Sequence, residues 1–387
     1  MYWVRDSLAD TSGHGAAPAW IYTLLFAVVL AFLTLVPVTA IAQQGVAPSS
    51  IESPSPTGGA VPGDVLGTSS DSDYWRAVRG GVEGIVSIPD KNAATLVQSE
   101  GEAWRSFRNG PMSLYLSWAL LGTIVLLGIF YAIRGRIKIA HGRAGQTITR
   151  FQAVERFGHW MLASSFIVLA LTGLNILYGR YTLKYVIGNE AFAFVTQVGK
   201  YLHNYLAFAF MAGLVMIFVM WVRHNFPDKT DIKWALQGGG IFSSKLHPPA
   251  KKFNAGQKVI FWLTILGGVS LSLSGWQLLF PYTTTFFADT FDKVNLVFGT
   301  ALPTDLTYLQ EQQLATLWHS IMSVFMICVI MAHIYIGSVG MEGAFDAMGS
   351  GEVDLNWAKE HHSLWVEEHL ADIHDRKGDK PAPQPAE

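Results

Sequence analysis

Two histidines, His319 and His333, lie fourteen residues apart in one long apolar segment of the sequence. Fourteen residues make just under four turns of an α-helix, so both imidazoles leave the same face, about 21 Å apart along the axis. An ionisable side chain inside a membrane helix is unfavourable, which implies a partner or a ligand for each ring. The alternative for each ring taken singly is a hydrogen-bonded core histidine.

The composition is that of a multi-pass membrane protein. Half of the 387 residues are hydrophobic, 14% are charged and 13% are aromatic, which separates the chain from ordinary soluble domains. The net charge of −2 gives no indication of a nucleic-acid partner. The chain has one cysteine, Cys328, which excludes both a C-x-x-C-H haem attachment and a cysteine-held iron–sulfur cluster in this chain. Any haem here must be held non-covalently.

Six apolar stretches are long enough to cross a bilayer, which takes about 20 residues of helix. The first, Trp20–Ile41, ends in an Ala-x-Ala pattern. We interpret residues 1–42 as a cleaved signal peptide, with an uncleaved N-terminal anchor as the alternative. The five further predicted spans are Ser113–Ile133, His159–Tyr178, Leu202–Val222, Val259–Phe280 and Leu314–Val339.

Lysine and arginine are concentrated in two loops, one between the second and third stretches and one between the fourth and fifth. By the positive-inside rule these loops face the cytoplasm of a bacterial inner membrane. Residues 43–112 are then periplasmic, and their Ser-, Pro-, Gly- and Ala-rich part at 44–73 is interpreted as a flexible linker. Residues 113–133 form an extra transmembrane helix, and residues 341–387 form a cytoplasmic tail.

Four of the twelve histidines lie in the predicted spans, and the orientation gives each a depth. His203, at the start of its span, shares the outer leaflet with His319, whereas His159 shares the inner leaflet with His333. Each pair comes from two helices at matching depth, as bis-imidazole ligation of a haem iron requires. We therefore expect two stacked haems, one held by each pair. The other eight histidines are expected to be solvated surface residues.

A proton or ion pathway is the competing interpretation, because intramembrane histidines serve there too. Such a pathway is expected to carry acidic partners, and the predicted spans contain no Asp or Glu. It also gives no reason for two histidines at each of two depths. A haem-free transporter therefore stays as the alternative from another class of protein.

Five motifs between residues 148 and 366 form a set. They are Glu155–Trp160, His224–Lys229, Phe253–Lys258, the His319/His333 pair with the run Ala332–Tyr335, and Trp357–His362. Together they resemble the cytochrome b556-type gamma subunit of respiratory, membrane-bound formate dehydrogenase.

The resemblance implies an all-α integral membrane protein in which residues 148–340 form a four-helix bundle around two b haems, with the extra transmembrane helix and the signal or anchor helix before it. The ligands that it implies are the same four histidines in the same pairs. It also implies a quinone site beside the cytoplasmic haem, at Asn254, Gly256 and Gln257. The alternative for these three residues is a helix cap followed by the first turn of a helix.

The implied function is that of a membrane cytochrome b subunit. It receives electrons from an iron–sulfur beta subunit, which works with a molybdopterin alpha subunit, and it reduces a quinone in the lipid bilayer. The chain lacks the cysteines and the pterin-binding domain that formate chemistry needs, so it is expected to be non-catalytic toward formate itself. A di-haem anchor of another respiratory enzyme, such as a hydrogenase or another molybdoenzyme, is the second interpretation.

Overall fold

The computed structural model describes residues 84–85, 95–97, 99–242 and 246–369. The predicted signal or anchor segment and the predicted linker lie outside the described residues. Within the described residues, five helices are long and apolar enough to cross a membrane. These spans are Ala103–Arg134, Ala153–Tyr181, Asn189–His224, Ala255–Leu279 and Tyr308–Gly340.

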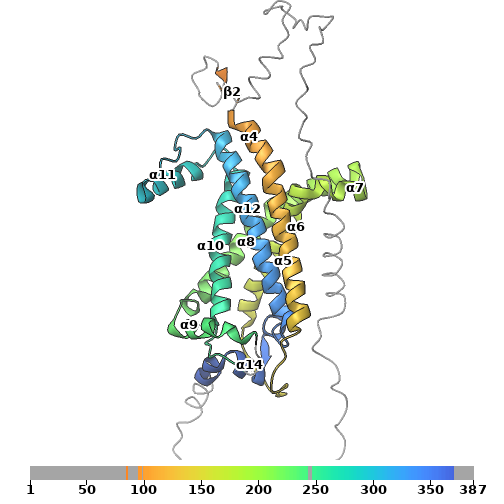
Figure 1. Cartoon of the computed structure of the whole chain (residues 1–387), viewed down its shortest axis with the longest axis vertical. Coiled ribbons are helices and arrows are strands. Elements are labelled where there is room, and N and C mark those ends of the chain that lie inside the picture. The colour runs from red at the N-terminus through yellow and green to blue at the C-terminus, as the bar shows by residue number, and fades with distance from the viewer. Residues whose placement is uncertain (1–83, 86–94, 98, 243–245, 370–387) are drawn as a thin grey trace, which may run out of the picture.

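The bundle is built from helices that run side by side along the long axis (Figure 1). Their bounds are α5 Ser113–Arg134, α6 Ala153–Tyr178, α8 Asn189–Trp221, α10 Ala255–Leu279 and α12 Tyr308–Tyr335. The closest neighbours are α6 with α8 and α10 with α12, and α5 packs on α12. A short helix, α4 Ser99–Phe107, leads into α5 through a π-helical turn at Arg108–Met112.

Shorter elements lie at the two ends of the bundle (Figure 1). The end with α7 Leu183–Ile187 and α11 Phe286–Phe298 is called the α11 end, and the other is called the α14 end. The α14 end holds α9 Lys229–Leu236, α13 Asp346–Gly349 and α14 Leu355–His361. Two antiparallel strand pairs join β1 Gly84–Ile85 to β2 Thr95–Val97 and β3 Thr147–Thr149 to β4 Glu352–Asp354.

Capping boxes fix where three of the long helices begin, because each one satisfies backbone N–H groups that have no partner inside the helix. Gln152 and Glu155 cap α6, Asn254 and Gln257 cap α10, and Thr307 and Gln310 cap α12.

Four of the five long helices begin earlier than their hydrophobic stretches predict, and in two of them the difference moves a histidine away from the helix start. Helix α8 starts at Asn189 rather than Leu202, so His203 lies well inside the helix and not at its start. Helix α6 starts at Ala153, which puts His159 in its second turn. The extra turns contain polar residues, which lower the hydropathy of a window without opposing helix formation.

Residues 341–369 of the predicted tail pack into the folded structure at the α14 end. His362, expected to be solvated, is 1% exposed, and its Nδ1 donates to the Lys251 carbonyl over 2.8 Å. Its Nε2 accepts from the buried Arg150 guanidinium at 3.0 Å. Arg150 also lies over the rings of Trp357 and Trp365. The expectation for His362 was wrong because the loops and the tail enclose it together.

Candidate functional site

The four span histidines form two close pairs. The rings of His203 on α8 and His319 on α12 have centroids 6.3 Å apart and planes inclined by 67°. His159 on α6 and His333 on α12 repeat the 6.3 Å separation with planes inclined by 61°. A metal ion bonded at about 2.0 Å to one nitrogen of each ring needs centroids about 6 Å apart. Both pairs therefore have the separation of two ligands on opposite sides of one ion.

Two imidazoles alone do not complete a metal site. In the part of the chain that the structure describes, no group of three or more His, Cys, Asp or Glu is arranged to hold a metal ion. The pairs do suit an iron whose remaining positions are filled by the nitrogens of a porphyrin, because such an iron needs only two axial ligands from the protein. The donor set thus fits haem better than it fits a bare ion.

Hydroxyl groups orient the rings nearer the α11 end. Thr172 Oγ1 on α6 lies 2.9 Å from His203 Nδ1, and Ser274 Oγ on α10 lies 2.9 Å from His319 Nδ1. Each hydroxyl donates its own proton to a backbone carbonyl one turn earlier in its helix. The imidazole Nδ1–H must therefore be the donor to the hydroxyl oxygen, which leaves Nε2 of both rings free to bind a metal.

Glycines allow the same two rings to lie against neighbouring helices. A Cβ added at Gly173 would lie 3.4 Å from Cε1 of His203, and one at Gly275 would lie 3.4 Å from Cε1 of His319. Each glycine directly follows the hydroxyl residue, so Thr172-Gly173 and Ser274-Gly275 serve the two rings in the same way. Close approach at the span glycines is what their sequence positions suggest, but the hydroxyl acceptors were not predicted; the repeated hydroxyl–glycine dipeptide is the signal that could have indicated them.

The other pair lacks such a hydroxyl and contains an unsatisfied atom. His159 Nδ1 is buried and has no hydrogen-bond partner in the described structure. The start of α6 is nevertheless held in place, because Arg156 donates to the Gly349 carbonyl and Trp160 Nε1 donates to the Met348 carbonyl. A buried nitrogen without a partner is uncommon in folded proteins, so His159 Nδ1 marks a place where an ordered water or a bound group is expected.

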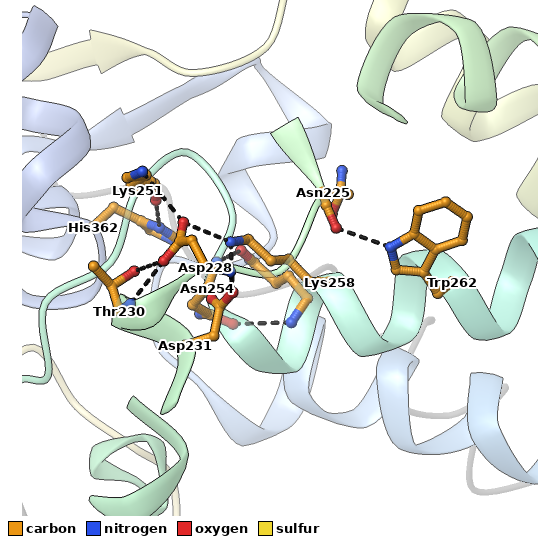
Figure 2. Close-up of polar contacts among 10 residues, drawn as sticks. Asn225, Asp228, Thr230, Asp231, Lys251, Asn254, Lys258, Trp262 and His362 are labelled. Carbon is orange, nitrogen blue, oxygen red and sulfur yellow. Dashed lines mark hydrogen bonds and ion pairs between the residues drawn. The ribbon is translucent and has the colours of Figure 1, made fainter. Parts of the chain in front are cut away.

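The residues expected at the quinone site lie at the start of α10, where Asn254 and Gln257 form the capping box; Figure 2 shows Asn254 at this turn. Asn254 Oδ1 accepts from the Gln257 backbone N–H at 2.9 Å, and Gln257 Oε1 accepts from the Asn254 N–H at 3.1 Å. The cap uses the two side-chain oxygens and leaves both side-chain NH₂ groups as donors. A Cβ on Gly256 would lie 3.0 Å from the Trp234 ring, so the indole of α9 lies directly against this turn.

A buried lysine joins α9 to the same turn (Figure 2). Lys258 is 4% exposed, and its Nζ lies 3.1 Å from Asp228 Oδ2 and 2.8 Å from Asp231 Oδ2. Burial works to raise the pKa of the Asp228 carboxyl, but hydrogen bonds from Thr230 and Lys258 outweigh it and hold that pKa well below its ordinary value. Two sequence motifs, His224–Lys229 and Phe253–Lys258, thus meet in one ion-paired cluster.

Known proteins are similar in sequence to the part of the chain that contains the histidine pairs and the α10 cap. The profile of the prokaryotic cytochrome b561 family matches residues 150–351. The Escherichia coli K12 formate dehydrogenase cytochrome b556(fdo) subunit is 31% identical over 223 residues, which cover 57% of this chain and 93% of that protein. The nitrate-inducible cytochrome b556(Fdn) subunit of the same organism is 28% identical over 223 residues, covering 57% and 91%. The Haemophilus influenzae formate dehydrogenase cytochrome b556 subunit is 24% identical over 226 residues, covering 58% and 84%.

Apolar helices of spanning length and paired imidazoles between them define an all-α, multi-pass membrane cytochrome b. The chain belongs to the prokaryotic cytochrome b561 family, and membership of a cytochrome b family implies haem b. The resemblance noted in the sequence is confirmed by the similarity to formate dehydrogenase cytochrome b556 subunits.

Proposed function

We propose that this chain is the membrane cytochrome b subunit of a formate dehydrogenase and that it passes electrons through two b haems to a membrane quinone. The single observation that carries the proposal is the equal 6.3 Å separation of two imidazole pairs within one bundle. The relatives support the choice of enzyme, because their similarity to this chain covers most of their own length.

In this proposal His203 and His319 hold one haem through their Nε2 atoms, and His159 and His333 hold the other. Thr172 and its counterpart on α10 keep the first pair in the required tautomer. The two haems, when bound, supply one-electron transfer, and bis-histidine ligation leaves no open position for oxygen or another substrate. The chain's own part is to fix the ligands at two depths and to exclude water between them.

The α10 cap supports a quinone site beside the His159/His333 pair. We infer that the free NH₂ groups of Asn254 and Gln257 donate to the quinone oxygens and that Gly256, which has no Cβ, lets the Trp234 indole come close enough to form part of the same site. The indole of Trp234 lies against this turn and offers an aromatic wall to a flat ring. Because the capping box already holds both amides in place, their donors are pre-oriented for a ligand.

The direction of electron transfer follows from the proposed orientation in a bacterial inner membrane. The α14 end, which receives the cation-rich loops, then faces the cytoplasm. The His203/His319 pair faces the periplasm, where an iron–sulfur subunit and a molybdopterin subunit would dock. Each electron that moves inward does work against the membrane potential, about 2.3 kcal/mol per charge per 100 mV.

The proposal is tested with native membranes and a reduced-minus-oxidised spectrum. Formate is expected to reduce the b-type absorption, and a quinone analogue is expected to reoxidise it. Reduction by hydrogen but not by formate, with a hydrogenase co-purifying, would assign the chain to the second class of enzyme. Absence of any b-type band would leave the transporter interpretation and would contradict both haem-based functions.

A further inference from the structure

Helix α9 presents two different faces. Thr230, Asp231 and Trp234 lie toward the protein, where Asp231 pairs with Lys258 and Trp234 contacts the first turn of α10. The opposite face is a stripe at helical spacing i, i+3, i+4 and i+7. This outer stripe consists of Lys229, Ile232, Lys233 and Leu236.

The outer stripe alternates positive charge with exposed apolar surface. Ile232 is 64% exposed and Leu236 is 84% exposed, although both are large aliphatic side chains. Lys229 and Lys233 are exposed as well, and neither makes an ion pair with any residue in the described ranges. A helix face that combines lysines with exposed aliphatic side chains is typical of contact with something both anionic and apolar.

The position of α9 indicates what binds to the outer stripe. The helix starts five residues after the span that ends at His224, and it packs on the start of the span that begins at Ala255. It therefore lies at the boundary of the bilayer, at the α14 end of the bundle (Figure 1). Anionic phospholipid offers at this depth the phosphates that lysines bind and the acyl chains that aliphatic side chains enter.

We propose that α9 is an interfacial helix that binds the anionic phospholipid leaflet. Lys229 and Lys233 contact the phosphate groups, and Ile232 and Leu236 insert at the boundary between headgroups and acyl chains. The buried ion pair of Asp231 with Lys258 ties the protein-facing side of α9 to α10, so the first turn of α10 is held at the membrane surface. The lipid contact of α9 is independent of the enzyme that the cytochrome serves and of a quinone binding nearby.

The depth of the stripe is measured with a fluorescent label on Leu236→Cys, in a Cys328→Ala background, in the full chain reconstituted into vesicles of phosphatidylcholine and phosphatidylglycerol. Lys359→Cys on α14, which is exposed at the same end, is the matched control. The label at 236 is expected to be quenched by nitroxide-labelled lipid and not by aqueous iodide. The label at 359 is expected to be quenched by iodide and not by the lipid. Equal iodide quenching at both positions would overturn the proposal, as would a label at 236 shielded from iodide but not quenched by lipid.

The preference for anionic lipid is measured by the association of spin-labelled phosphatidylglycerol relative to phosphatidylcholine. The double variant Lys229→Gln/Lys233→Gln is expected to weaken this preference by about fivefold for each lysine removed. Lys359→Gln should leave it unchanged. An unchanged preference in the double variant would overturn the role of the two lysines, and with it the anionic leaflet as the partner.

Discussion

Thr172 Oγ1 lies 2.9 Å from Nδ1 of His203 across the α6–α8 contact. Ser274 Oγ and His319 Nδ1 repeat this distance across the α10–α12 contact. The two helix pairs thus present their imidazoles to the middle of the bundle with the same tautomer and the same kind of support. A hydrogen bond to the non-ligating nitrogen of a metal-binding histidine fixes the ring plane and raises the basicity of the other nitrogen.

Removing that support should loosen one haem and leave the other. Thr172→Val keeps the side-chain volume but removes the acceptor for His203 Nδ1–H. We expect haem at the His203/His319 pair to be bound about 10- to 100-fold more weakly. Transfer of haem to an apoprotein acceptor measures this loss.

Thr123→Val on α5 is the matched control, because the Thr123 hydroxyl bonds only to a carbonyl of its own helix. Equal haem retention in the Thr172 and Thr123 variants would show that the hydroxyl does not support a ligand.

The space beside His319 gives a steric prediction. An added Cβ at Gly275 meets the ring at 3.4 Å, which is an ordinary van der Waals contact, so Gly275→Ala should keep both haems. Gly275→Leu should displace the ring and lower the haem content from two to one per polypeptide. Gly122→Leu on α5, where no atom lies within 4 Å of the added Cβ, should keep both. Two haems in Gly275→Leu would contradict the placement of a haem at this pair.

The pairing of the four span histidines could be predicted from the sequence. The hydroxyl groups that hold two of their rings in place could not. Depth in a bilayer follows from helix rise and loop charge, and matching depth was enough to pair His203 with His319 and His159 with His333. The hydroxyl acceptors depend on how each helix is rotated about its axis. Hydropathy does not report that rotation when lipid and neighbouring helices are both apolar.

The burial of His362 at the α14 end also could not be predicted from the sequence, for a different reason. His362 is enclosed by a loop more than a hundred residues earlier, where the Lys251 backbone carbonyl accepts a hydrogen bond from its Nδ1–H. No local sequence pattern indicates such a long-range contact.

The sequence predicts a helix cap at Asn254 as the alternative to a ligand site, and Asn254 does cap α10. A cap and a ligand site can coexist here, because the cap uses the side-chain oxygens only.

A variant that preserves the cap separates the two roles of Asn254. Aspartate is as good an N-cap as asparagine but has no NH₂ donor, so Asn254→Asp should keep the thermal stability of the protein. Loss of one hydrogen bond to a ligand should raise the KM for quinone and the inhibitory concentration of a quinone analogue by roughly 5- to 30-fold, with kcat less affected. Unchanged KM and inhibition with unchanged stability would leave Asn254 as a cap only.

Residues 346–366 at the α14 end should lose folding stability at acid pH. Burial lowers the pKa of His361 on α14 to about 4, from an ordinary value of 6.5. The unfolded tail then binds more protons than the folded tail between these values, so folding stability falls as the pH drops from about 6.5 toward 4. Hydrogen exchange of residues 346–366 should show falling protection over this range. His361→Phe keeps an aromatic ring against Trp357 but cannot titrate, so its protection should fall less steeply. An equal slope in the variant would exclude His361 as a cause.

The most direct measurement is pyridine haemochrome quantitation per polypeptide on the purified chain and its histidine variants. Two haems b are expected for the unaltered chain and one for any single replacement of His203, His319, His159 or His333 by alanine. Double replacement within a pair should leave one haem, and double replacement across pairs should leave none. A chain that binds no haem when haem supply is ample would contradict the central claim, as would equal haem content in the two kinds of double variant.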